Sequence, residues 1–173
     1  MNPTTIDWLN ALPADQANEQ LRRVCGAEWW TEQMTQQRPF TDASALTAAA
    51  DAAFDRMPRE AWLEAFACHP RIGDINSLRM KFAGNKDWSA GEQSGAASAD
   101  EQTLVRLAAG NDAYFERFGY TFIVCATGKS AAEMLAILEA RLANDDESEL
   151  PVAAAEQRKI THLRLEKLNT ESK

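Results

Sequence analysis

The sequence predicts an all-α fold, a single-domain helical bundle of about seven to nine helices with no significant sheet over residues 1–173. Two observations support this fold class. Residues that start and stop helices recur from one end of the chain to the other, and only residues 120–128 have the composition of a strand. A chain of 173 residues fits one domain whose core needs no disulfide.

Five helices are predicted before residue 70, joined by short connections that place neighbours antiparallel. Thr5 is expected to cap the first helix, and Asp42 is expected to cap the fourth. Pro39 should stop the third helix, because the residue before a proline avoids the helical conformation. The second to fifth helices are expected at 13–26, 27–40, 43–57 and 58–69.

The helical pattern lapses from Pro70 to Trp88, where glycine and asparagine interrupt it. An irregular stretch of this length in a compact domain is more often functional than decorative. The capping-box spacing then occurs three times, at Ser89/Glu92, Ser98/Glu101 and Ser130/Glu133. Helices are expected at 99–119, after Ser130, and at 152–168. In the last, an apolar face is predicted from Val152, Ile160, Leu163 and Leu168.

The segment "YTFIVCATG", residues 120–128, is apolar and β-branched, but no second segment offers it a strand partner. It is therefore predicted to be a buried extended connector between helices. Its backbone N–H and C=O groups would then be available to bond something other than a sheet.

Composition and charge exclude several classes of function. The chain has 26 acidic and 18 basic residues, a formal net charge of −8, and no Lys/Arg cluster, so nucleic-acid binding is not expected. No apolar run is long enough for a spanning helix, and the first residues do not form a secretory signal. Three cysteines without C-x-x-C spacing indicate neither a disulfide framework nor a zinc site, and a cytoplasmic location is expected. No metal motif occurs.

His69 is the first candidate for chemistry. The sequence "FACHPRIGDIN" places it where a helix ends at an X-Pro step, so a rigid backbone can aim its ring into a cavity. The alternative is a structural histidine at a helix end. His162 lies inside a charged helix and is interpreted as a surface or packing residue.

Glu92 and Arg164 each allow a functional and a structural interpretation. The capping box with Ser89 explains Glu92 without any function, although the adjacent Gln93 is not needed for capping. Arg164 could grip a planar anion through two parallel hydrogen bonds, or it could belong to a solvated helix face. Cys125 lies in an apolar run without a neighbouring base, which favours a buried, inert thiol.

Four motifs together resemble one family. They are "HPRIGD" at 69–74, "SAGEQSGA" at 89–96, "FGYTFIVCATGKS" at 118–130 and "KITHLRLEKL" at 159–168. In this order and spacing they are similar to the 2-oxo-4-hydroxy-4-carboxy-5-ureidoimidazoline (OHCU) decarboxylases, which release CO2 and form (S)-allantoin in urate breakdown. Residues 9–40, from "LNALPADQ" to "RPF", also resemble the N-terminal pattern of that family.

The resemblance implies an all-helical enzyme, usually a homodimer, that needs neither a metal nor an organic cofactor. It implies that His69, Glu92 and Arg164 are the catalytic residues. It also implies that the substrate is bound by Pro70, Ser89, Gln93, Phe122, Ile123, Val124, Cys125 and Ala126.

Two other functions are compatible with the same residues. One is a cofactor-free amidohydrolase or isomerase acting on a cyclic ureide. The other is a non-catalytic helical binding module in which His69 and Glu92 are only caps. Following CO2 release against ring opening separates the first alternative from a decarboxylase, and the turnover of His69→Ala separates the second.

Overall fold

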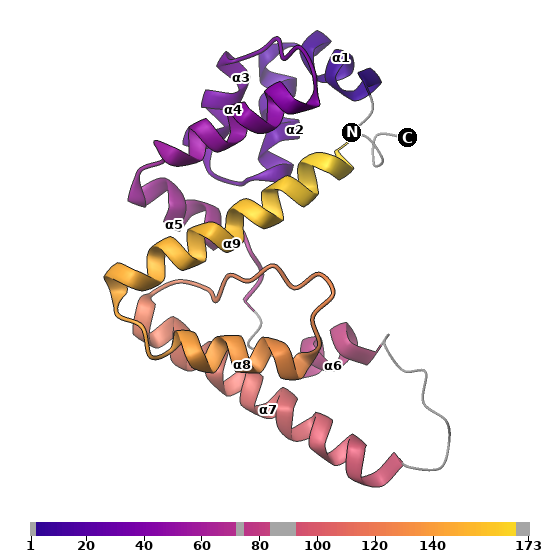
Figure 1. Ribbon diagram of the computed structural model, residues 1–173, viewed down its shortest axis with the longest axis vertical. Helices are drawn as coiled ribbons and strands as arrows, with labels where there is room; N and C mark the ends of the chain where they lie inside the picture. Colours follow the sequence, from indigo (N-terminus) through magenta and orange to yellow (C-terminus); the bar gives the residue numbers. More distant parts are fainter. Residues whose placement is uncertain (1–2, 72–74, 84–92, 169–173) are drawn as a thin grey trace. The chain divides into compact units, whose positions relative to one another are not determined.

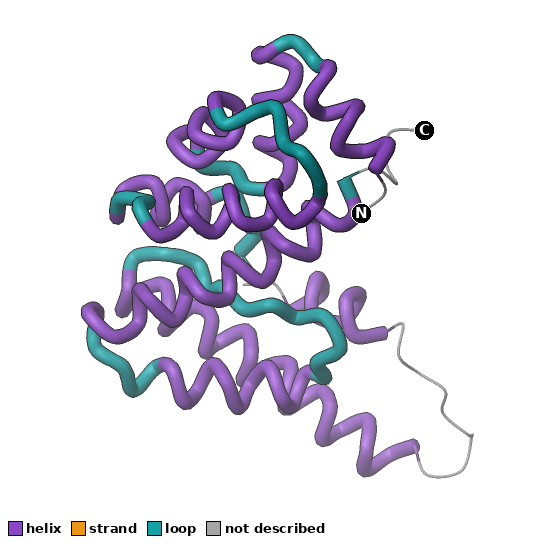
Figure 2. Tube along the Cα trace, turned by 45° about the horizontal axis from the view of Figure 1, so that its top comes forward, coloured by secondary structure: helices purple, strands orange, loops and turns teal. Residues whose placement is uncertain are grey.

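The computed structural model describes residues 3–71, 75–83 and 93–168 (Figure 1). The helices in these ranges are α1 Pro3–Ala11, α2 Ala14–Val24, α3 Glu28–Gln36, α4 Ala43–Asp55, α5 Arg59–Ala67, α6 Ile75–Ala83, α7 Gln93–Phe118, α8 Ala131–Arg141 and α9 Asp146–Lys167. No strand occurs within these described residues, and the long connection between α7 and α8 runs as a loop (Figure 2). The predicted all-α class is therefore confirmed.

The chain divides into two compact units. The first comprises Met1–Cys68 and Ala154–Lys173, and the second comprises His69–Ala153. The single domain expected from the length of the chain stays a prediction. Among the helices described, none is both long and apolar enough to cross a membrane.

The core of the first unit is built around a row of aromatic rings. Trp30 of α3 stacks on Phe54 of α4 with 5.5 Å between ring centroids, and Phe54 stacks on Trp62 of α5 at 5.2 Å. Phe66, one turn further along α5, continues the row. All four side chains are at most 7% exposed. This burial of large rings holds α3, α4 and α5 together.

The buried face of α9 differs from the predicted one. Gln157, Thr161 and Leu165 are at most 1% exposed, whereas Val152 is 37% exposed. Of the four residues predicted to form the apolar face, only Leu168 is buried. The polar pair can be buried because the Gln157 amide donates to the Thr161 hydroxyl at 3.3 Å.

In the second unit, α7 and α8 lie side by side (Figure 1). Tyr114 of α7 is completely buried and contacts the rings of Phe118, Tyr120 and Phe122. Gly119 ends α7 with φ of +75°, the left-handed conformation that glycine adopts without strain. The chain therefore turns at Gly119, and Tyr120 and Phe122 pack against Tyr114 of the helix that it has just left.

Most predicted helix ends are confirmed. Asp42 caps α4 by accepting from the Ala45 N–H at 2.8 Å, and Ser130 with Glu133 forms the predicted capping box of α8. The box proposed at Ser89/Glu92 lies outside the described residues.

Four boundary predictions are wrong. Helix α1 begins at Pro3, a residue favoured in a first turn, so Thr5 is inside the helix rather than its cap. A helix, α6, occupies part of the stretch predicted to be irregular, because the interrupting glycines lie beyond its two ends and Leu78 is buried. Helix α7 begins at Gln93, so Ser98 does not start it.

The fourth wrong boundary is the start of α9, which precedes Pro151. Asp145 accepts hydrogen bonds from the Ser148 backbone N–H at 2.8 Å and the Ser148 hydroxyl. This N-terminal cap and the acidic residues of the first turn stabilise a start before the proline.

Gly110 of α7 packs against Leu138 of α8. A Cβ atom at this position would lie 2.7 Å from Cδ2 of Leu138, which is fully buried. In an unpacked helix, glycine-to-alanine stabilises by about 1 kcal/mol. Here we expect Gly110→Ala to lower the free energy of unfolding by about 1 kcal/mol, because Leu138 must shift in a packed core. Urea unfolding measures the difference, and a gain in stability would contradict the close approach.

Candidate active site

His69 follows directly on the end of α5, where Cys68 is the C-terminal cap residue. Its side chain is partly buried, and Pro70 is exposed. Arg71, two residues on, donates to the Asp112 carboxylate of α7 at 2.7 Å, and its guanidinium lies 4.3 Å from the centre of the Phe115 ring. The sequence Pro70-Arg71 after His69 is thus fastened to α7 within the second unit. Sequence reasoning did not assign this role to Arg71.

The segment Phe122–Ala126 is extended and lies between α7 and α8. Its first four side chains are at most 8% exposed. Some of its carbonyl groups are already used: that of Ile123 accepts from Arg141 at 2.6 Å, and that of Cys125 accepts from Lys129 at 2.7 Å. Within the described residues, however, the backbone N–H groups of 122–124 form no hydrogen bond. A buried segment with unbonded donors can bind the carbonyl or carboxylate oxygens of a ligand.

A buried ion pair holds this segment in place. Arg141, at the end of α8, donates through Nε to the Glu149 carboxylate at 2.8 Å. Arg141 is 6% exposed and Glu149 is not exposed at all. The Tyr114 hydroxyl donates to the same carboxylate, and the Arg141 guanidinium lies 4.7 Å from the centre of the Phe122 ring. Burial, with the Glu149 hydrogen bond, raises the pKa of Tyr114 far above its usual range, so this phenol stays protonated.

The Arg141–Glu149 pair was not predicted from the sequence. The available signal was the spacing of Arg141 from Met134, Leu135 and Leu138, which places an arginine on the apolar face of a helix. An arginine at such a position needs a buried carboxylate partner.

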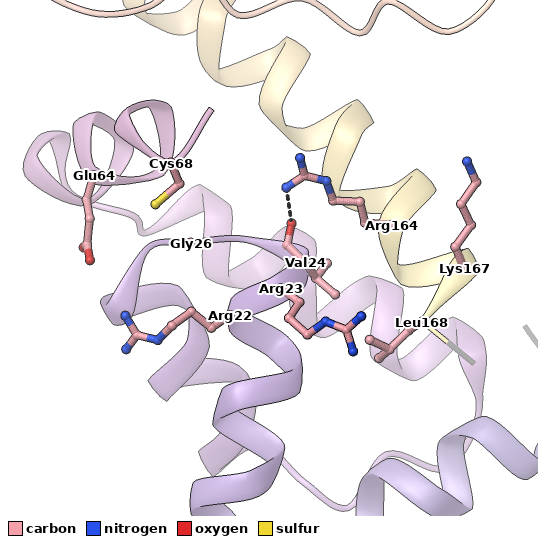
Figure 3. A pocket seen from close by; sticks show the side chains of 9 residues that line it. All are labelled: Arg22, Arg23, Val24, Gly26, Glu64, Cys68, Arg164, Lys167 and Leu168. Atoms are coloured by element: carbon pink, nitrogen blue, oxygen red, sulfur yellow. Dashed lines mark hydrogen bonds between the residues drawn. The ribbon is translucent and has the colours of Figure 1, made fainter. Parts of the chain in front are cut away.

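Arg164 lines a pocket of about 530 Å³ in the first unit (Figure 3). The pocket lies between the ends of α2, α5 and α9, and Cys68 and Glu64 also line it. Arg164 donates to the Val24 carbonyl at the end of α2, at 3.1 Å. It forms no ion pair with a carboxylate among the described residues. Its guanidinium therefore keeps donors for an anion.

The predicted site residues are distributed over both units. His69, Pro70 and Phe122–Ala126 belong to the second unit, and Arg164 belongs to the first. Gln93 is the first residue of α7. Ser89 and Glu92 lie outside the described residues.

The three cysteines are free thiols. Cys125 is buried, as its apolar surroundings predicted, and Cys68 is exposed. Burial raises the pKa of the Cys25 thiol to about 11. In the part of the chain that the structure describes, no group of three or more His, Cys, Asp or Glu side chains could hold a metal ion.

The family model described as OHCU decarboxylase matches residues 10–166. The chain belongs to the OHCU decarboxylase family. A mouse relative named 2-oxo-4-hydroxy-4-carboxy-5-ureidoimidazoline decarboxylase is 34% identical over 131 residues, which are 75% of this chain and 72% of the relative.

A solved structure of this family, titled "Crystal structure of OHCU decarboxylase in the presence of (S)-allantoin", superposes with a TM-score of 0.69. It is 36% identical, and the match covers 89% of this chain and 99% of the solved chain.

A longer relative also matches this OHCU decarboxylase family chain. The uric acid degradation bifunctional protein TTL of Arabidopsis thaliana is 41% identical over 148 residues. The match covers 83% of this chain but only 44% of the Arabidopsis protein.

The buried ion pair makes a test of stability possible. Arg141→Met leaves the Glu149 carboxylate buried without its cation, so we expect a loss of about 3–5 kcal/mol in the free energy of unfolding. As a control, Arg106→Met removes an exposed pair with Glu139 and should cost under about 1 kcal/mol. Urea unfolding of both variants measures these changes in the free energy of unfolding. Equal small losses in the two variants would show that the buried pair stabilises the fold little.

Cys25 generates a prediction about pH. Its pKa is raised from 9.0 to about 11 in the fold, so the folded chain holds this proton more tightly than the unfolded chain does. The stabilisation is present below pH 9 and is lost as pH rises from 9 to 11, by up to about 3 kcal/mol. Urea unfolding at several pH values should show a gap between wild type and Cys25→Ala that narrows over this range. Parallel curves would contradict the raised pKa.

Proposed function

We propose that this chain decarboxylates OHCU to (S)-allantoin and CO2 without a metal or an organic cofactor. The observation that carries the proposal is membership of the OHCU decarboxylase family over residues 10–166. Relatives from mouse and from Haloferax volcanii carry the name of this activity. The reaction makes the chain a carboxy-lyase of urate breakdown.

The decarboxylation can proceed without a cofactor, because the substrate itself can accept the electron pair that CO2 leaves behind. When the carboxylate leaves as CO2, the electron pair of the broken C–C bond stays on the ring carbon. The conjugated imine and carbonyl groups of the substrate can accept that pair, and a proton then replaces CO2 on the carbon. The protein must orient the substrate, polarise these groups and deliver the proton to one face.

We assign these tasks to His69, Glu92 and Arg164. The His69 ring bonds the substrate hydroxyl or carboxylate and serves as acid and base, since a histidine titrates near neutral pH. Glu92 accepts hydrogen bonds from the ureido or ring N–H groups, and Arg164 holds the anionic end. Two features support the assignment: a rigid tether follows His69 through Arg71, and Arg164 has no carboxylate partner among the described residues.

Phe122–Ala126 would bind the planar edge of the substrate through its backbone. The N–H groups of 122–124 support this role because they have no hydrogen-bond partner among the described residues. The carbonyls of Ile123 and Cys125 support it less, because Arg141 and Lys129 already bond them. Pro70, Ser89 and Gln93 are proposed as further substrate contacts.

Assembly and location are part of the same proposal. The resemblance to the family supports a homodimer, and the free thiols Cys25, Cys68 and Cys125 support a reducing compartment such as the cytoplasm.

The two histidines supply a matched test. We expect His69→Ala to lower kcat at least ~100-fold, because a general acid–base group contributes about that much. The control is His162 of α9, whose ring lies 2.9 Å from the Asp51 carboxylate of α4. His162→Ala should leave kcat within about twofold. Freshly generated OHCU is supplied, spontaneous decay is subtracted, CO2 release is measured, and (S)-allantoin is followed by circular dichroism.

The outcomes separate the alternatives. Ring opening without CO2 release would indicate an amidohydrolase. A His69→Ala variant that folds and keeps full turnover would remove His69 from the mechanism.

A further inference from the structure

Two basic side chains, one from each end of α8, bond carbonyl groups of the extended segment in the second unit. The connection that contains this segment runs along α8 in the direction opposite to the helix (Figure 1, Figure 2). Arg141, the last residue of α8, donates to the Ile123 carbonyl at 2.6 Å. The Lys129 ammonium, just before α8 begins, donates to the Cys125 carbonyl at 2.7 Å. Both ends of α8 are therefore joined to the segment.

The two bonded carbonyls belong to the same edge of the segment. In an extended chain the N–H and C=O groups of one residue point to one side, and those of the next residue point to the other. Ile123 and Cys125 therefore share one edge, and Phe122 and Val124 share the opposite edge. Within the ranges that the structure describes, the backbone groups of Phe122 and Val124 have no hydrogen-bond partner. Both residues are at most 8% exposed, so these groups have little access to water.

The backbone around Lys129 holds its side chain over the segment. Gly128 has a φ of +75°, the left-handed conformation that glycine adopts without strain. The Lys129 N–H donates to the Ala126 carbonyl at 3.1 Å and closes a turn. Ser130, the next residue, caps α8. A lysine ammonium is strongly hydrated and usually extends into water, whereas this one is half-buried and bonds the backbone.

We propose that Lys129 is a positioning residue of the proposed reaction. Together with Arg141 it fixes one edge of the segment, and this leaves the N–H and C=O groups of Val124 on the other edge for the substrate. A ureide carries C=O and N–H groups side by side, a pattern that pairs with both backbone groups of one extended residue. The inference rests on the proposed function and extends it to a residue that lies beyond Phe122–Ala126.

Lys129 permits a cleaner test than Arg141 does. The Arg141 guanidinium is buried with the Glu149 carboxylate, so its replacement should destabilise the whole fold. Lys129 is half-buried, and its replacement leaves that buried pair intact. A variant of Lys129 therefore releases one end of the segment while the other end stays bonded.

The kinetic test is Lys129→Met. We expect KM for OHCU to rise ~10-fold and kcat to stay within about threefold, because the lost bond orders a binding edge and takes no part in proton transfer. A purely structural role gives a different result: partial unfolding lowers the amount of active protein and therefore the apparent kcat, but it leaves KM unchanged. Lys129→Arg keeps a donor for the Cys125 carbonyl and should restore KM to within about twofold of wild type.

The control variant removes another cation that contacts α8. Arg106 of α7 pairs with Glu139 of α8, and it bonds no carbonyl of the segment among the described residues. Arg106→Met should therefore leave KM within about twofold of wild type. Thermal unfolding verifies that all three variants fold.

Amide hydrogen exchange, measured by NMR with (S)-allantoin as the probe, tests the free edge directly. In wild type and in Arg106→Met, allantoin should slow exchange of the Val124 N–H ~10-fold, and at the same concentration Lys129→Met should lose most of this protection.

Two results would overturn the role of Lys129. One is a Val124 N–H that allantoin does not protect in wild type, a measurement that needs no variant. The other is the same KM in Lys129→Met as in Arg106→Met. Wild type that releases no CO2 from OHCU would instead overturn the proposed function, whatever the exchange rates are.

Discussion

The second unit depends on the buried ion pair between Arg141 and Glu149. Two charges removed from water are costly unless each is fully bonded, and here the guanidinium bonds the carboxylate and the Ile123 carbonyl. The Asn144 amide bonds the second carboxylate oxygen at 2.7 Å. The pair therefore ties the end of α8 and the start of α9 to the extended segment. That tether lets Phe122–Ala126 stay extended without a strand partner among the described residues.

Several polar residues of this chain that could bind a ligand or cap a helix lie at helix ends. His69 stands just beyond α5, Arg164 lies in the last turn of α9, and the capping box of Ser130 begins α8 immediately after the extended segment. A helix end offers unpaired carbonyls or N–H groups and a backbone that changes direction, so it can aim a side chain and stabilise a charge. The apolar stacks of Trp30, Phe54 and Trp62 supply the rigid support behind these ends in the first unit.

Acidic residues and arginines occupy different environments in this chain. Most of the acidic surplus lies on exposed helix faces, while a few arginines are placed where they have specific partners. Arg141 is buried with the Glu149 carboxylate, and Arg71 bonds the Asp112 carboxylate of α7. Arg164 bonds the Val24 carbonyl and has no carboxylate partner among the described residues. The first two hold backbone in position, and the third is suited to bind a ligand.

The all-α class and several helix caps were predictable from the sequence, because they depend on neighbours three or four residues apart. Asp42, Ser130 and Gly119 marked helix ends correctly on that basis. The family also followed from short motifs in a fixed order. The roles of His69, Glu92 and Arg164 stay predictions.

Contacts between distant residues were decided only by the tertiary structure. The pairing of Arg141 with Glu149, the bond from Arg71 to Asp112, and the polar stripe of α9 each join partners whose match cannot be read from local spacing. The start of α9 before Pro151 follows the same logic, since a cap at Asp145 and the buried Glu149 outweigh the cost of a proline inside the helix. A side chain's neighbours along the chain set its backbone conformation, but its partners in space determine whether it can be buried with its charge.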